Sequence, residues 1–337
     1  MAAVEPNTLE PNTLLDSYRY GFSTLNPQSV ASKSFKTYLF GYPIAHSLAP
    51  LVQSTLFKEL SVPWTYTLFE SLSAADFLSK LKAADCIGSA ITMPHKVTFV
   101  QHVDDLTHEA RAIGAINTVF LRRGADGSTR YIGTNTDCIG VREAFLQNIP
   151  GIRAQSEGRP ALIIGGGGAC RAAVYSLWRW MGSSRIYLVN RLESEVHAVI
   201  AHFETVPGFA GDLVHVQTIE AAAELETPML VVGCVPDLPP KERGEILARD
   251  VALTFLRRPE KGHVLEMAYH PNPITAFYLL ARQNGWNVLP GTEAMIYQGI
   301  AQQSLWMEKP SDEFPVPEAR EVIKQALKVT HENTDGL

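Results

Sequence analysis

The first half of the chain contains polar side chains that could bind a polyhydroxylated carboxylic acid and move a proton. They occur in four short motifs: Gly41-Tyr-Pro-Ile-Ala-His-Ser-Leu-Ala-Pro50, Ile91-Thr-Met-Pro-His-Lys96, Gly114-Ala-Ile-Asn-Thr118 and Gly133-Thr-Asn-Thr-Asp-Cys-Ile-Gly140. A lysine can act as an acid or a base, while amides, carboxylates and hydroxyls can hold ring hydroxyls. Each motif alone also has a structural interpretation: the asparagines could stabilise turns, the serine could cap a helix, and the lysine could be a solvated surface charge.

A glycine-rich segment, Gly165-Gly-Gly-Gly-Ala-Cys170, lies between an apolar run and a segment with helical periodicity. Gly165 permits a tight turn and Gly167 lets the backbone approach a pyrophosphate, which then meets the N–H groups at the start of the helix. Cys170 stands where a third glycine is usual. A glycine-rich turn that only allows tight packing is the alternative, but the order of strand, turn, helix and strand favours dinucleotide binding.

The residues after the second strand of this unit bear on the choice of dinucleotide. They read Asn190-Arg-Leu-Glu-Ser-Glu195. Arg191 could pair with a 2′-phosphate or stack on adenine, whereas Glu193 and Glu195 would repel that phosphate. We therefore expect NAD as the cofactor, with NADP possible.

Strand and helix patterns alternate along the chain, and this predicts an α/β fold with mostly parallel sheets. In the first half, strands are expected at 37–40, 64–69 and 88–92, and helices at 50–60 and 74–84. A second unit begins near Gly140, with strands expected at 161–164, 185–189, 229–233 and 264–267 and a helix at 169–180. After Gly291 the pattern is helical, and the last helix carries an apolar stripe.

Composition excludes several classes of function. The 337 residues include 29 Lys plus Arg and 35 Asp plus Glu, a net charge of −6, so binding to nucleic acid or to an anionic membrane is not expected. No apolar run approaches the length of a membrane span, and the N-terminus has no secretory pattern, so we expect a cytoplasmic protein. The four cysteines are scattered, which indicates reduced and mostly buried thiols. The histidines show no ligand spacing with cysteines or carboxylates, so no metal is expected.

Together, in this order and upstream of the glycine loop, the four motifs resemble the shikimate/quinate dehydrogenase family over about residues 36–305. The sequences of the motifs at 114–118, 133–140 and 291–298 most resemble those of the fungal quinate 5-dehydrogenases. The resemblance implies an NAD(P)-dependent enzyme that interconverts quinate and 3-dehydroquinate, and it leaves shikimate and 3-dehydroshikimate open as a second substrate pair. It also implies two domains: a substrate-binding α/β domain at 36–139, and a Rossmann domain at 140–291. A C-terminal helical segment, about 292–330, would return to the first domain, and residues 1–35 would form a flexible tail.

The resemblance also implies roles for particular residues. Lys96 matches the catalytic lysine and Asp137 its partner. The residues that match substrate-binding positions are Ser47, Thr92, Asn117, Tyr269 and Gln298. The residues that match cofactor-binding positions are Gly165, Gly167, Gly168, Ala169, Asn190, Arg191, Met267 and Gly291.

Several positions depart from the family pattern. Ala49 stands where a second carboxylate-binding hydroxyl is usual, and Ala90 where an asparagine is usual. Glu195 and Leu192 replace residues that bind the NADP phosphate, and Gly233-Cys-Val-Pro236 replaces an Asn-Ala-Thr-Pro stretch. These departures leave two alternatives open: an NADP-dependent shikimate dehydrogenase, and a catalytically silent relative that binds a metabolite as a sensor or regulator. Whether the chain is a monomer or a homodimer also stays open.

Overall fold

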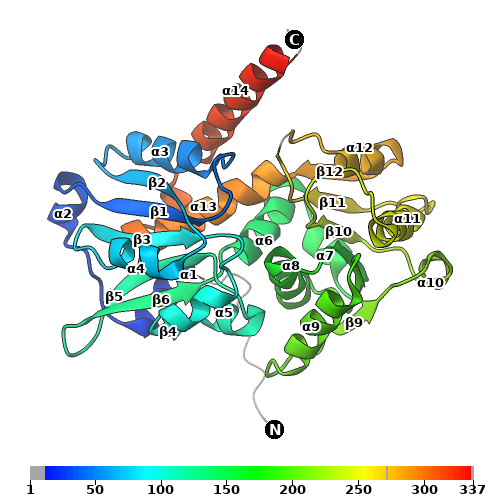
Figure 1. The fold of residues 1–337 in the computed structure, drawn as a ribbon, viewed down its shortest axis with the longest axis horizontal. Coiled ribbons are helices and arrows are strands. Elements are labelled where there is room, and N and C mark those ends of the chain that lie inside the picture. Colours follow the sequence, from blue (N-terminus) through cyan, green and yellow to red (C-terminus); the bar gives the residue numbers. More distant parts are fainter. Residues whose placement is uncertain (1–11, 271, 335–337) are drawn as a thin grey trace.

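The computed structural model describes residues 12–270 and 272–334, which form two α/β domains side by side (Figure 1). Two helices, α6 (Asp137–Asn148) and α13 (Gly291–Met307), lie where the domains meet and pack against each other. α6 carries the chain from the first domain into the second, and α13 brings it back. The expected α/β class and the return of the C-terminal segment to the first domain are confirmed.

The first domain is built on a sheet whose described strands run in the order β2-β1-β3-β5-β6-β4. The strands are β1 (Lys36–Gly41), β2 (Thr65–Glu70), β3 (Cys86–Ile91), β4 (Asp105–Leu106), β5 (Thr118–Arg123) and β6 (Thr129–Thr134). β1, β2 and β3 are mutually parallel, as predicted, but β5 is antiparallel to both β3 and β6. The sheet is therefore mixed. The β5–β6 hairpin was not predicted, although Asp126-Gly127 at its turn is a typical hairpin dipeptide.

Helices of the first domain begin at recognisable signals. Pro50 occupies the first turn of α3 (Ala49–Glu59), where its missing N–H removes no helical hydrogen bond. Ser73 caps α4 (Ala74–Leu81), and Thr107 caps α5 (His108–Ile113). A short 3-10 helix, η2 (Thr98–His102), follows β3. The helices pack their apolar faces on the sheet and close its core.

The second domain contains a fully parallel sheet in the order β12-β11-β10-β7-β8-β9. Its strands are β7 (Ala161–Ile164), β8 (Arg185–Val189), β9 (Asp212–His215), β10 (Leu230–Gly233), β11 (His263–Glu266) and β12 (Asn287–Pro290). Numbered within the domain this is the order 3-2-1-4-5-6 of the dinucleotide-binding Rossmann fold. The direction along the sheet reverses between β7 and β10, and ligands bind at such a switch point.

Helices cover both faces of the second sheet (Figure 1). They are α7 (Ile152–Ser156), α8 (Gly168–Arg179), α9 (Glu193–Glu204), α10 (Ile219–Glu224), α11 (Arg243–Leu256) and α12 (Ala276–Gln283). The central strands β7 and β10 are buried along their whole length, which explains why their sequences are continuous apolar runs rather than alternating ones. The predicted strands and helix of this domain are confirmed, while the edge strands β9 and β12 were not predicted.

The C-terminal helix α14 (Val316–Thr334) packs against α3 and α13 of the first domain. Ala319 and Ile323 of the predicted apolar stripe are buried, so the stripe serves as core packing. A 3-10 turn, η3 (Ser311–Glu313), separates α13 from α14. Within the described ranges, every helix is too short or too polar to cross a bilayer.

Residues 12–35, part of the segment interpreted from sequence as a flexible tail, are ordered against the first domain. They include α1 (Thr13–Ser17), η1 (Tyr18–Tyr20) and α2 (Pro27–Ser32). The backbone of Phe22 bridges to Arg123, and the Thr24 N–H donates to Glu308 at 3.1 Å. Buried Arg122 also meets Glu308 at 3.4 Å, and its guanidinium lies over the Tyr18 ring. Leu14 is buried, and Leu25, Val30 and Phe35 pack on the core of the first domain, so the segment is held by apolar as well as polar contacts. Residues 1–11 of the predicted tail lie outside the described part.

Candidate active site

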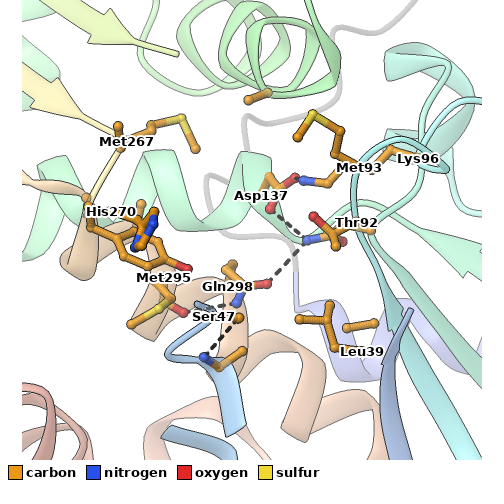
Figure 2. A pocket seen from close by; sticks show the side chains of 18 of the residues that line it. Leu39, Ser47, Thr92, Met93, Lys96, Asp137, Met267, His270, Met295 and Gln298 are labelled. Carbon is orange, nitrogen blue, oxygen red and sulfur yellow. Dashed lines mark hydrogen bonds and ion pairs between the residues drawn. The ribbon is translucent and has the colours of Figure 1, made fainter. Parts of the chain in front are cut away.

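A cavity of about 450 Å³ lies between the two domains. Its lining includes the predicted catalytic pair, every predicted substrate-binding residue and three predicted cofactor-binding residues: Lys96, Asp137, Ser47, Thr92, Asn117, Tyr269, Gln298, Ala169, Met267 and Gly291. In Figure 2, Lys96 and Met93 lie on one side, Met267 and His270 lie on the other, and Asp137 lies between them. Residues from distant parts of the sequence therefore surround one cavity.

Lys96 and Asp137 form an ion pair at the inner end of this cavity. Their side chains are 19% and 11% exposed, so the pair is shielded from bulk water but open to the cavity. Asn117 donates to the other carboxylate oxygen of Asp137 at 2.8 Å. The same amide lies 3.3 Å from Oε1 of Gln298, which reaches in from α13. Lysine, carboxylate and two amides are thus joined in one hydrogen-bonded group.

Local structure fixes each member of this group. Lys96 follows β3, and its carbonyl accepts from the Ile116 N–H at 2.7 Å. Asp137 is the first residue of α6, where the positive end of the helix dipole stabilises a carboxylate. The side-chain oxygen of Asn117 accepts from the Thr136 N–H at 2.7 Å, so this buried asparagine ties β5 to the start of α6. Asn117 therefore has a structural role between two elements, and it also lines the cavity.

Ser47 and Tyr269 line a different part of the cavity, together with Ala49. Tyr269 hydrogen-bonds to Ser47 and to the Leu48 backbone, and burial raises its pKa. These contacts join the loop after β11 to the loop before α3. Ser47 also accepts from the Ala49 N–H at 3.2 Å, but Leu48 is the N-cap of α3 and no side chain caps this helix, so the expected capping role of Ser47 is wrong.

Tyr66, on β2, is a cavity residue that the sequence interpretation missed. Its side chain is buried, and its hydroxyl has no hydrogen-bond partner among the described residues. Burial also raises its pKa, so the hydroxyl stays protonated. An unpartnered hydroxyl on a cavity wall is available to a ligand. The aromatic strand signal at 64–69 predicted the strand but not the direction of this side chain.

The glycine loop lies at the switch point of the second sheet. Gly165 has φ +132°, a conformation that favours glycine, and it packs closely on Cys234 at the end of β10. Gly167 is the residue before α8, and no atom of the described residues lies within 4 Å of the position that a β-carbon would occupy there. Gly167 has no side chain that could cap the helix, so the first N–H groups of α8 are left for a ligand. The loop therefore fits a dinucleotide pyrophosphate.

The glycine loop also lies close to the Lys96–Asp137 ion pair. A β-carbon at Gly168, in the first turn of α8, would lie 3.5 Å from Cδ of Lys96. Gly168 therefore lets the second domain approach the lysine of the first domain closely. A cofactor held by this loop would lie next to Lys96.

The segment after β8 lies beside this loop. Asn190 donates from its side chain to Oε2 of Glu195 at 2.6 Å, and both pack against Gly166. Arg191 instead pairs with Glu245 of α11 at 2.6 Å. Backbone N–H groups and Arg191 hold the pKa of Glu245 down to about 2, so this pair stays charged. Glu193 faces away from the glycine loop, toward His197 and Gln217.

The departure at Gly233 has a structural cause. A β-carbon at Gly233 would collide with the carboxylate of Glu266 on the neighbouring strand β11. Glu266 is 1% exposed and one of its oxygens has no partner among the described residues, so burial raises its pKa to about 8. The buried glutamate fills the space where the family pattern has an asparagine side chain.

Glu193, His197 and His215 bring potential metal-ligand atoms within 4.8 Å of one another on the surface. This corrects the statement that the histidines lack ligand spacing. Glu193 and His197 are four residues apart on α9, and folding adds His215 from β9. The group lies outside the cavity.

The fold and the cavity together define a two-domain dehydrogenase. Residues 39–119 match the family described as "Shikimate dehydrogenase substrate binding domain". A quinate dehydrogenase of Emericella nidulans is 42% identical over 287 residues, covering 81% of this chain and 87% of the relative. The chain belongs to the shikimate/quinate dehydrogenase family.

Solved structures agree with this conclusion. A dehydroquinate dehydratase and shikimate dehydrogenase structure from S. pombe AroM has a TM-score of 0.69 and 31% identity, covering 86% of this chain and 53% of that chain. A shikimate 5-dehydrogenase of Thermus thermophilus, solved in complex with NADP(H) and shikimate, has a TM-score of 0.66 and 26% identity. That match covers 87% of this chain and 100% of the other.

Proposed function

We propose that this enzyme oxidises a secondary ring alcohol of quinate reversibly to the ketone 3-dehydroquinate, with NAD as the preferred cofactor. The observation that carries the proposal is the hydrogen-bonded group of Lys96, Asp137 and Asn117 in a cavity between a hydroxyl-lined wall and a glycine loop. The 42% identical quinate dehydrogenase supports the choice of substrate.

Lys96 is the acid/base in this proposal. During oxidation its amine accepts the proton of the ring hydroxyl, and during reduction its ammonium returns that proton. Asp137 orients both the hydroxyl and the ammonium. Because oxidation requires Lys96 to accept a proton, turnover in that direction should rise with pH.

Side chains on several elements would position the ring. Thr92, Asn117 and Gln298 offer polar groups for the ring hydroxyls, next to the acid/base pair. Ser47 and Tyr269 offer hydroxyls for the carboxylate. Holding the substrate at both ends aligns the reacting carbon and supplies much of the rate enhancement.

The cofactor would bind across the carboxyl ends of β7 and β10. The backbone at Gly165, Gly167, Gly168 and Ala169 would hold the pyrophosphate, Asn190 and Arg191 would flank the adenosine, and Met267 and Gly291 would border the nicotinamide. When bound, the nicotinamide accepts the hydride. NAD is preferred because Glu195, beside the glycine loop, would repel a 2′-phosphate, while Arg191 is already paired with Glu245.

The absorbance of reduced nicotinamide tests the proposal in four assays, with quinate or shikimate and NAD⁺ or NADP⁺ at mildly alkaline pH. Turnover is expected to be strongest with quinate and NAD⁺. Turnover strongest with shikimate and NADP⁺ would reverse both specificity assignments. No turnover in any assay, with nucleotide still bound, would reject the proposed activity.

A further inference from the structure

The cavity has few groups that can carry positive charge. Among the described residues that line it, these groups are Lys96, His46 and His270. Lys96 is already paired with Asp137. A carboxylate that enters the cavity therefore meets two histidines as its available cationic partners.

The two histidines lie face to face. The ring centroids of His46 and His270 are 4.2 Å apart and the ring planes differ by 29°. His46 comes from the loop after β1 in the first domain, and His270 from the loop after β11 in the second. Both side chains are exposed, so the stacked pair bridges the two domains at the mouth of the cavity.

The pair adjoins the group expected to receive the carboxylate. His46 directly precedes Ser47 and His270 directly follows Tyr269, and Ser47 hydrogen-bonds to Tyr269. Ala49, which offers no hydroxyl, lines the same cavity. In Figure 2, His270 and Lys96 lie on opposite sides of the cavity. One substrate held by both would have its carboxylate at the histidines and its reacting carbon at the lysine.

Burial and neighbouring groups affect the charge of His46 in opposite directions. Desolvation lowers the pKa of His46, the neighbouring His270 lowers it further, and Glu70 opposes both effects. Glu70 is itself occupied, since it accepts from the Ile44 N–H at 2.7 Å and the Ala45 N–H at 3.2 Å. The hydroxyls of Tyr66 and Tyr269 have raised pKa values and stay neutral. Asp137, the one carboxylate among the described residues that line the cavity, is paired with Lys96.

We propose that His46 and His270 form a clamp that binds the carboxylate of the substrate at the cavity mouth, in place of the hydroxyl missing at Ala49. This inference rests on the proposed function, because it needs a hydroxy-acid substrate. Binding of the anion stabilises the protonated clamp, so binding takes up a proton. Histidine ordinarily changes charge between about pH 5 and 8, and affinity for the acid should therefore fall as pH rises through this range.

Calorimetric titration of quinate into the NADH-saturated protein tests the clamp, because this combination binds without turnover. Quinamide, which has a neutral carboxamide in place of the carboxylate, is the matched ligand. We expect quinate to bind at pH 6 about tenfold more tightly than at pH 8, the size of one charged hydrogen bond, and quinamide to bind equally at both. The double variant His46→Phe/His270→Phe keeps two aromatic rings but cannot carry charge. It should lose about tenfold in quinate affinity at pH 6 and show no pH dependence, with quinamide affinity unchanged.

His270→Phe alone leaves His46 able to take up a proton, so this variant should keep part of the quinate affinity and part of its pH dependence. His197→Ala, at an exposed histidine outside the cavity, is the control and should behave as the wild type. Quinate affinity that is independent of pH and survives both phenylalanine variants would overturn the clamp while leaving the proposed function intact. A wild-type protein that binds neither quinate nor shikimate would instead reject the proposed function, and the clamp with it.

Discussion

Asn190 donates to Glu195 at 2.6 Å, whereas Glu193, two residues earlier, turns toward Gln217 and His197. Of the two carboxylates that the sequence left equally suspect in cofactor choice, one therefore lies against the glycine loop and the other does not. This separation makes the two glutamates a matched pair for experiment.

The first prediction concerns cofactor choice. Glu195→Gln should raise kcat/KM for NADP⁺ by about tenfold, because removing a charge near the 2′-phosphate removes a repulsion of about 1.4 kcal/mol. Steady-state kinetics with both cofactors measure the change. Glu193→Gln is the control and should leave the NAD⁺/NADP⁺ ratio close to that of the wild type. An equal effect of the two variants would show that cofactor choice depends on general charge rather than on the carboxylate beside the loop.

The second prediction concerns the acid/base. Lys96→Ala should lower turnover by roughly 10²–10⁴-fold, the range that general acid/base groups contribute, while nucleotide affinity stays near normal. Turnover and NADH binding by fluorescence are the two measurements. Lys36→Ala removes an exposed lysine that pairs with Asp85 and serves as the control. Wild-type turnover in Lys96→Ala would refute the role.

The third prediction concerns the missing hydroxyl. Ala49→Ser should lower the KM for quinate, because the new hydroxyl can donate to the carboxylate, an interaction worth about 1.5–3 kcal/mol. Ala45→Ser, on the loop before α3 but outside the cavity lining, should leave KM unchanged. An unchanged or higher KM in Ala49→Ser would indicate that the carboxylate does not reach this position.

The fourth prediction concerns stability and pH. Burial raises the pKa of Glu266 from 4.5 to about 8, so the folded protein keeps a proton that the unfolded chain loses. Stability from this group is fully present below pH 4.5 and is lost as pH rises to about 8. Glu266→Gln cannot lose a proton, so its Tm should fall less than that of the wild type between about pH 6 and pH 9. Calorimetric melting curves measure this difference. Glu260→Gln, an exposed change, should follow the wild type, and parallel Tm curves for Glu266→Gln would contradict the buried proton.

The sequence was sufficient to predict the α/β class, because buried parallel strands such as β7 and β10 are continuous apolar runs between helical segments. The glycine loop was equally clear, since its place between a strand and a helix gives its spacing a physical meaning. The β5–β6 hairpin was harder to predict, because Arg122, Arg123 and Arg130 interrupt its apolar pattern. Arg122 is buried, with Ser17, Glu308 and two aromatic rings as partners, and none of these contacts can be read from neighbouring residues.

In the candidate site, too, some features could be predicted from the sequence and others could not. The motifs predicted which residues line the cavity, because their order along the chain resembles a known family. They did not predict Tyr66 or the stacking of His46 on His270, since these depend on side-chain directions across two elements or two domains. The close fit of Glu266 against Gly233 is likewise a contact between neighbouring strands that only the fold brings together.

The placement of Asp137 at the first turn of α6 has a mechanical consequence. α6 and α13 lie together between the domains (Figure 1). Asp137 on α6 pairs with Lys96 of the first domain, and Gln298 on α13 contacts Asn117. If the second domain rotates about an axis along α6 and α13, the space for the dinucleotide between the domains widens. Lys96 and Asp137 stay close to that axis and move little. The cofactor can then exchange without dismantling the alignment of the acid/base pair.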